Sequence, residues 1–257
     1  MRRIVVPSEV LSVMSPGVVE LGRRETHYGR DVLRLKVGDE VTLIDGFGLI
    51  GMGRVVSTKK TGLEVDLVEF GKTTARESAL QISLLVGLPR GSRWDFILQK
   101  ATELGVDRIV PVYTSHSQVR VPVNKVEQRC ERWARIAAEA ARQCGRTIAP
   151  DIGHPKPLEV ALGLLSAEPD IDLRLLAWEE LSQRPPGSIL DFHGGKIIAP
   201  RHVALLVGPE GGLTKAEVEL CVKNGFQTIG LGPRILRVET ACLVLTAYIQ
   251  HWFGDMT

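Results

Sequence analysis

The sequence is poor in cysteine, and the few cysteines it has are scattered. Cys130, Cys144, Cys221 and Cys242 form no C-x-x-C pair and no Cys/His spacing of the kind that binds zinc. Their spacing excludes a disulfide scaffold and makes a structural metal site unexpected. We expect four small, buried or half-buried thiols in a reduced compartment, and no bound metal.

Long apolar runs are also missing. The N-terminal stretch MRRIVVP is too short for the apolar part of a signal peptide, and the C-terminal run CLVLTAYI is too short to span a bilayer. No internal repeat and no low-complexity tract is present. These absences predict a soluble, cytoplasmic protein with no membrane partner.

The chain as a whole has almost no excess of charge of one sign, but two of its segments are basic. The formal net charge is only +2. Residues 1–36 carry seven Lys/Arg against four Asp/Glu, and residues 90–146 carry eleven against six. A local basic excess is typical of a protein that touches phosphates, although ordinary solvated helix faces would give the same counts.

The richest pattern lies in the last quarter of the chain. The unbroken apolar run VALLV, residues 203–207, predicts a parallel strand covered on both faces, and a glycine-rich turn at residues 208–212 follows it. Thr214 and Glu217 form a capping-box pattern, so a helix should begin immediately after Thr214. Gly225 is placed to end that helix.

A second glycine loop follows about twenty residues later. The short strand TIGL, residues 228–231, leads into GPRILRVET, residues 232–240, and then into a final helix. Because the carboxyl ends of parallel strands meet at one edge, the two loops should form a crevice of backbone amides and carbonyls that can bind a ligand. Residues 203–250 contain neither G-x-G-x-x-G nor a P-loop lysine, so neither motif accounts for the crevice.

The first part of the chain has the pattern of a small β-barrel. Strands are expected at residues 2–7, 41–44, 53–57 and 63–70, with a short basic helix at 27–35. The polar stretch at 71–79 has the composition of a linker. We therefore divide the chain into a β-barrel domain, residues 1–72, and a larger domain, residues 73–257.

The larger domain alternates strands and helices, which favours a parallel sheet. Strands are expected at residues 81–87, 108–113 and 173–177, and helices at 92–104, 123–143 and up to about 165. Ser92 with Asp95 should cap the first of these helices, and Lys100 should pair with Glu103 on its surface. Residues 182–200 should form a loop or lid.

The motifs GPEGG and LGPRILRVETA closely resemble the SPOUT superfamily of methyltransferases and, within it, the 16S ribosomal RNA (uracil-N3)-methyltransferase family. QKATELGV, EAARQCGR and the residues around Arg34 are similar as well, so the resemblance covers most of the chain. It implies an α/β fold: a parallel-sheet SPOUT domain with a deep trefoil knot, preceded by a PUA-like β-barrel that binds RNA. It also implies S-adenosylmethionine as cofactor and a homodimer packed through the knot region. The sequence departs from the family at Tyr28, Gly29, Asp31 and His116.

The resemblance also implies where the cofactor and the RNA bind. Backbone groups at the strand ends and in the loops should hold the cofactor, at Leu176, Ala177, Gly208, Pro209, Glu210, Gly211, Leu231, Gly232, Ile235, Leu236 and Thr240. The candidates for RNA contact are Arg3, Arg23, His27, Arg34, Arg142 and Arg146. For several of these side chains, a structural hydrogen bond, a salt bridge or a solvated position is the alternative.

The chemistry of methyl transfer limits which catalytic groups to expect. Substitution at a sulfonium methyl needs no metal and no covalent protein intermediate. The protein must align the methyl carbon with uracil N3 and stabilise the negative charge left when N3 loses its proton. The candidates for that role are Arg237, and Arg3 or Arg34 in the basic first part of the chain. Glu210 in the first motif and Glu239 in the second are the nearest carboxylates for a general base, although each could instead cap a helix or bind loop backbone.

The sequence thus predicts a methyltransferase acting on N3 of a uridine in 16S ribosomal RNA, with naked RNA or the small ribosomal subunit as its partner. Two alternatives remain open: a SPOUT enzyme acting on another base or RNA, and a non-catalytic RNA-binding factor in ribosome assembly. A metabolic enzyme that binds a nucleotide in the crevice would leave the basic barrel unexplained.

Overall fold

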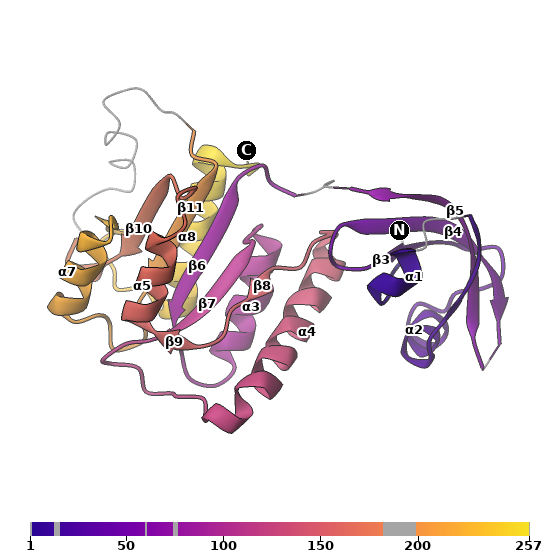
Figure 1. The fold of residues 1–257 in the computed structure, drawn as a ribbon, viewed down its shortest axis with the longest axis horizontal. Helices are drawn as coiled ribbons and strands as arrows, with labels where there is room; N and C mark the ends of the chain where they lie inside the picture. The colour runs from indigo at the N-terminus through magenta and orange to yellow at the C-terminus, as the bar shows by residue number, and fades with distance from the viewer. Residues whose placement is uncertain (1, 13–15, 60, 74–76, 182–198, 257) are drawn as a thin grey trace. The chain divides into compact units, whose positions relative to one another are not determined.

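The computed structural model describes residues 2–12, 16–59, 61–73, 77–181 and 199–256 of the chain. They form two compact units, Met1–Glu77 with Ala138–Ala149, and Ser78–Ala137 with Pro150–Thr257. Figure 1 shows the elements of both units along the chain. Almost all of the loop or lid predicted at 182–200 lies outside the described residues.

The first unit is built on a five-stranded sheet in the order β1-β3-β4-β5-β2. Strand β1 pairs parallel with β3, and the other neighbours are antiparallel. Leu63, Val65 and Leu67 point to the core at every second position of β5 and join Ile4 and Leu43 there. The strands are β1 Arg3–Val5, β2 Gly17–Leu21, β3 Glu40–Ile44, β4 Leu49–Thr58 and β5 Leu63–Lys72. Since β5 ends at Lys72, the first two residues of the predicted linker belong to a strand.

The short helices of this unit differ from the prediction. Helix α1, Ser8–Ser12, and strand β2 were not predicted, because both are only five residues long, Pro16 lies between them and β2 begins with Gly17. The helix expected at 27–35 is α2, Arg23–His27, continued by a π-helical turn, Tyr28–Val32. It stops before Arg34, whose φ of 53° is left-handed.

The second unit is a parallel sheet of seven strands, in the order β12-β10-β11-β6-β7-β8, with β9 also paired to β7. Every pair is parallel. The strands are β6 Gln81–Gly87, β7 Arg108–Tyr113, β8 Asp151–Ile152, β9 Lys156–Pro157, β10 Leu173–Ala177, β11 His202–Val207 and β12 Gln227–Ile229. The apolar run at 203–207 is buried in β11, as predicted, and β11 lies between β10 and β6.

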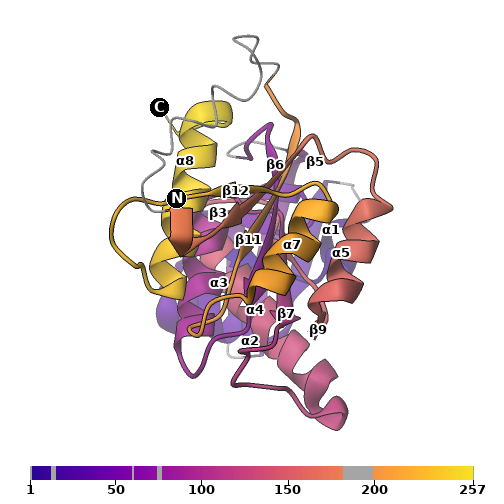
Figure 2. The same cartoon turned by 90° about the vertical axis from the view of Figure 1, so that its left-hand side faces the viewer.

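Helices cover both faces of this sheet (Figure 2). Helices α3, Arg93–Glu103, α4, Val126–Cys144, and α8, Val238–Phe253, share one core with the inward residues of β6. Helices α5, Leu158–Ser166, and α7, Lys215–Lys223, share the opposite core. Short 3-10 turns occur at Val123–Lys125 and Glu179–Leu181. The last turns of α4 belong to the first unit.

The parallel arrangement brings the carboxyl ends of β6, β10, β11 and β12 to one edge of the sheet. Both glycine loops begin at this edge, after β11 and after β12. The trefoil knot in this unit stays a prediction.

The cysteines are free: Cys130, Cys221 and Cys242 are buried and Cys144 is half-buried, as predicted. Within the described ranges, no group of three or more histidine, cysteine or acidic side chains is placed to hold a metal ion. None of the helices described there combines the length and the apolar character needed to cross a membrane.

Of the two predicted helix caps, the one at Thr214 forms and the one at Ser92 does not. At α7, the Thr214 hydroxyl accepts a hydrogen bond from the backbone N–H of Glu217 at 3.2 Å, and the Glu217 carboxylate accepts from the Thr214 N–H at 2.8 Å. At α3, Ser92 precedes the helix, but its side chain makes no capping hydrogen bond. The predicted Ser92 cap is wrong because this residue has helical angles, φ −72° and ψ −9°, and not the extended backbone of a cap. Asp95 pairs with Arg132 instead.

We expect Thr214→Ala to lower the free energy of unfolding by about 1 kcal/mol, because it removes an acceptor for an end N–H of α7. Ser92→Ala should leave the free energy of unfolding almost unchanged. Urea denaturation of both variants measures the difference, and equal losses would contradict the assignment of the caps.

Candidate active site

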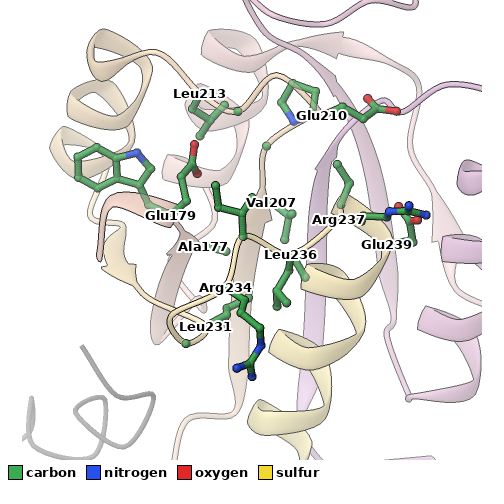
Figure 3. A pocket seen from close by; sticks show the side chains of 18 of the residues that line it. Ala177, Glu179, Val207, Glu210, Leu213, Leu231, Arg234, Leu236, Arg237 and Glu239 are labelled. Carbon is green, nitrogen blue, oxygen red and sulfur yellow. The ribbon is translucent and has the colours of Figure 1, made fainter. Parts of the chain in front are cut away.

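A cavity of about 330 Å³ lies at the carboxyl edge of the parallel sheet, within the size range of small-molecule sites. The ends of β10 and β11, the first loop at 208–213, the second loop at 231–237 and the first turn of α8 line it. Figure 3 shows side chains from both loops around this cavity. Both glycine loops therefore contribute to one cavity, as the sequence predicts.

The first loop turns tightly against β6. A Cβ added to Gly87, the last residue of β6, would lie 2.4 Å from the backbone nitrogen of Pro209. Gly212 has a φ of +70° and donates its N–H to the carbonyl of Pro209 at 2.8 Å, which closes the turn. Close approach at Gly87 and left-handed backbone at Gly212 therefore both require glycine.

The second loop is open and basic. Ile235 is 87% exposed although it is apolar, and Arg234 and Arg237 are exposed as well. Neither guanidinium has an ionic partner in the part of the chain that the structure describes. Arg237 directly precedes α8, where the helix dipole adds positive potential. An anion would therefore be stabilised at this end of the cavity.

Arg93, the first residue of α3, links two carboxylates at the cavity wall. Its guanidinium lies 2.6 Å from Oε1 of Glu210 and 3.9 Å from Oε1 of Glu239. The backbone N–H of Arg90 also donates to Oε1 of Glu210, at 3.0 Å. The other oxygen of Glu239 is buried, and no residue that the structure describes hydrogen-bonds to it.

These contacts argue against Glu210 as a general base. Burial raises the pKa of its carboxyl, but hydrogen bonds from the backbone N–H groups of Arg90 and of Glu210 itself, together with the Arg93 guanidinium, more than offset this. The pKa of Glu210 is thus below its ordinary value of 4.5. A general base needs a pKa near the working pH, so the lowered pKa makes Glu210 a poor candidate for the predicted catalytic role.

The lowered pKa of Glu210 predicts how its contribution to stability depends on pH. Because the folded-state pKa lies below the ordinary value of 4.5, the ionised carboxylate stabilises the fold fully above that value. This contribution is lost as the pH falls through the folded-state pKa. Glu210→Gln should therefore unfold more easily than the parent chain at neutral pH, and the difference should shrink in acid. A difference in urea denaturation that stays constant with pH would contradict this.

Most of the predicted cofactor residues line this cavity. They are Ala177, Gly208, Pro209, Glu210, Leu231, Gly232, Ile235 and Leu236, and the catalytic candidate Arg237 also lines it. Leu176 does not, because it is fully buried within the sheet between Leu206 and Thr228. Thr240 and Gly211 are not among the lining residues either. The binding roles of all these residues remain predictions.

Gly211 lies against His116, one of the departures from the family. A Cβ on Gly211 would come within 2.8 Å of Cβ of His116, whose Nδ1 lies 3.3 Å from the carbonyl oxygen of Gly212. His116 thus supports the outer side of the first loop.

Trp178 and Glu179 directly follow β10, whose end the family resemblance implies as a further wall of the cofactor pocket, and both line the cavity. Arg93 also lines the cavity and was not predicted from the sequence. Arg93 is part of an amphipathic helix and reads as an ordinary surface residue. Its place just after β6, the strand beside β11, is the signal that could have identified it, because that position is at the ligand-binding edge.

In the first unit, three of the basic candidates for RNA contact have accessible charge. Arg23 and Arg34 are exposed, and Arg3 is half-buried on β1. His27 is also exposed, and its Nδ1 lies 2.7 Å from Oδ2 of Asp31. Contact between RNA and these four side chains, and catalysis by Arg3, stay predictions.

The two arginines near the end of α4 are engaged within the protein. The Arg142 guanidinium lies over the Tyr28 ring, 4.4 Å from its centroid, and donates to its hydroxyl. Arg146 is only 4% exposed in its side chain, and its Nε lies 2.8 Å from Oε2 of Glu77, which is 8% exposed. Because Arg146 is buried in this ion pair, we do not retain it as an RNA contact.

Gly29 and Asp31, two other departures, also have structural roles. Asp31 pairs with His27, and a Cβ on Gly29 would lie 2.5 Å from Cδ2 of Leu63. The π-helical turn can therefore pack against the sheet only with glycine at this position, unless Leu63 moves.

Two family models match the chain. The model described as an RNA methyltransferase domain matches residues 76–250, and the model described as an RNA methyltransferase PUA domain matches residues 21–68. Together they match the larger part of the chain, with residues in both units.

Two curated relatives of the chain have the same name. The chain is 34% identical over 229 residues to the ribosomal RNA small subunit methyltransferase E of Bacillus subtilis, covering 88% of this chain and 87% of the relative. It is 32% identical over 249 residues to the protein of the same name from Synechocystis, covering 97% of this chain and 77% of the relative.

Two solved structures also align with nearly the whole chain. A ribosomal RNA small subunit methyltransferase E from Neisseria gonorrhoeae, bound to S-adenosylmethionine, aligns with a TM-score of 0.84 at 32% identity and full coverage of both chains. A Legionella pneumophila protein described as a methyltransferase, also solved with this cofactor, aligns with a TM-score of 0.82 at 30% identity over 98% of each chain.

Proposed function

Since the chain belongs to the RNA methyltransferase family, together with the ribosomal RNA small subunit methyltransferase E proteins, we propose that it methylates N3 of a uridine in 16S ribosomal RNA. The methyl donor is S-adenosylmethionine, which two structural neighbours of nearly full coverage contain. The observation that carries the proposal is the cavity shared by the two glycine loops at the carboxyl edge of the sheet.

The residues around the cavity suit this cofactor. Ala177, Leu231 and Leu236 offer apolar surface to an adenine ring, and glycines in both loops leave the backbone accessible. Three arginines and three glutamates line the same cavity, so groups of both signs are available to the ammonium and carboxylate ends of a methionine. When bound, S-adenosylmethionine supplies a methyl group already activated by the sulfonium.

The chain itself must align the acceptor and stabilise charge. We assign charge stabilisation to Arg237, because its guanidinium has no ionic partner among the described residues and lies at the positive end of α8. Negative charge that develops as uracil N3 loses its proton would be favoured there. Glu210 already accepts hydrogen bonds from Arg90 and Arg93 and is given no role in proton transfer.

The first unit is the proposed RNA-binding domain. Arg3, Arg23, His27 and Arg34 supply basic groups to the phosphates, and the match to a PUA domain model supports this role. We also propose a domain boundary after residue 72. The protein would form a homodimer packed through the C-terminal region that includes α8, where the chain would be knotted.

Nucleoside mass spectrometry tests the proposed reaction. Small-subunit RNA from a strain that lacks this gene should be missing one N3-methyluridine, and the purified protein with S-adenosylmethionine should restore it on isolated subunits. Methylation of a different base would indicate another enzyme of the same fold. RNA with no missing modification, together with no heat of binding at near-millimolar S-adenosylmethionine, would favour a non-catalytic assembly factor.

A further inference from the structure

Arg93 belongs to neither glycine loop, yet it contacts residues on two sides of the cavity. Its guanidinium reaches Glu210 in the first loop and faces Glu239 in the first turn of α8. We propose that Arg93 is a positioning residue of the cofactor site, which links the first glycine loop and the start of α8 to α3 and so sets the width of the cavity. This inference rests on the proposed function, because it assigns the cavity to S-adenosylmethionine.

The contacts on Glu210 fix the first loop. Two donors, the Arg93 guanidinium at 2.6 Å and the backbone N–H of Arg90 at 3.0 Å, converge on the same carboxylate oxygen. Arg90 lies in the turn between β6 and α3, and Arg93 is the first residue of α3. The loop that carries Glu210 therefore cannot move outward without breaking both hydrogen bonds. Charge-assisted hydrogen bonds of this length are among the stronger ones in proteins.

The contact with Glu239 is longer but has an electrostatic consequence. The Glu239 side chain is 16% exposed, and the ion pair it forms among the described residues is with Arg93 at 3.9 Å. Without Arg93, the carboxylates of Glu210 and Glu239 would both lie at the cavity wall with no cation between them. Two partly buried like charges repel, so the loop and the helix start should move apart.

Arg93 could instead only stabilise α3 through an ion pair, and a control variant distinguishes that role from positioning of the cofactor site. Asp95 of the same helix pairs with Arg132, through two hydrogen bonds of 2.8 and 2.5 Å. The Arg132 side chain is 44% exposed and that of Arg93 is 42% exposed, but Arg132 is not among the residues that line the cavity. Arg132→Ala is therefore a matched control that removes a similar ion pair from α3.

Calorimetric titration with S-adenosylmethionine tests the inference. Arg93→Ala should raise the dissociation constant about tenfold, roughly what one lost charge-assisted hydrogen bond costs. Arg93→Lys should recover part of the affinity, since lysine keeps the charge but not the planar set of donors. Arg132→Ala should bind as the parent chain does.

A double-mutant cycle measures whether Arg93 and Glu210 are coupled in their effect on cofactor affinity. A purely structural role of Arg93 would produce no such coupling. If Arg93 acts through Glu210, Arg93→Ala in the Glu210→Ala background should weaken binding much less than in the parent chain. Unchanged affinity in Arg93→Ala, equal weakening in Arg132→Ala, or full additivity in the cycle would overturn the inference. Failure of the parent chain to bind S-adenosylmethionine would refute the proposed function itself, which distinguishes the two results.

Discussion

Replacing Gly87 by alanine is expected to weaken S-adenosylmethionine binding on the order of 100-fold, although Gly87 does not line the cavity. The added Cβ would lie 2.4 Å from the nitrogen of Pro209 and 2.9 Å from the carbonyl carbon of Gly208. Both are backbone atoms and cannot rotate away as a side chain can. The first loop must therefore shift away from β6 and lose its position relative to the second loop. Overpacking should also cost about 1–3 kcal/mol of stability.

Gly163→Ala is the matched control for Gly87→Ala. Gly163 belongs to α5 in the same unit, and an added Cβ there would meet no atom within 4 Å. The control should leave cofactor affinity unchanged and raise stability by up to about 1 kcal/mol, as alanine favours helix over glycine. Calorimetric titration of both variants with S-adenosylmethionine measures the two affinities. Affinity in Gly87→Ala equal to that of the control would show that the loop does not depend on this close approach.

Arg237→Ala is expected to slow methyl transfer by roughly 10²–10³-fold while leaving cofactor affinity nearly unchanged. This is the usual effect of removing one preorganised group that stabilises developing charge. The reason is positional: Arg237 lines the cavity, directly precedes α8 and has no ionic partner within the described residues. Single-turnover transfer to isolated small subunits, at saturating S-adenosylmethionine, measures the chemical step.

Arg234→Ala separates this role from general basicity of the loop. Arg234 is exposed and lines the same cavity, but it is in the middle of the loop, and Figure 3 shows it near Leu231 and apart from Arg237. Its removal should slow transfer by less than about tenfold, because it is not at the start of α8. Equal losses for the two variants would indicate attraction of RNA phosphates instead of stabilisation at the reacting base.

The sequence was most informative where local chemistry alone determines structure. The buried run at 203–207 became β11, and the Thr214–Glu217 capping box formed at α7. The paired glycine loops met in one cavity because parallel strands place their carboxyl ends together. Each of these features depends on a few adjacent residues, or on a rule that holds for every parallel sheet.

Contacts between residues distant in sequence could not be predicted in this way. Arg146 is predicted from the sequence as a candidate for RNA contact, but Glu77, sixty-nine residues earlier, accepts its hydrogen bond in a buried pair. Nothing in the sequence around Arg93 indicates its contacts with Glu210 and Glu239, which the fold brings together. Ser92 had the residue type of a cap but not the backbone angles. Charge pairing and close backbone approach depend on tertiary structure that periodicity does not encode.

The most direct test of the central claim is a crystal structure of this protein grown with S-adenosylmethionine. We expect density for the whole cofactor between the first loop at 208–213 and the second loop at 231–237, with Arg93 still in contact with Glu210. Cofactor bound elsewhere on the chain, or density for these loops closed against each other with no ligand between them, would contradict the account.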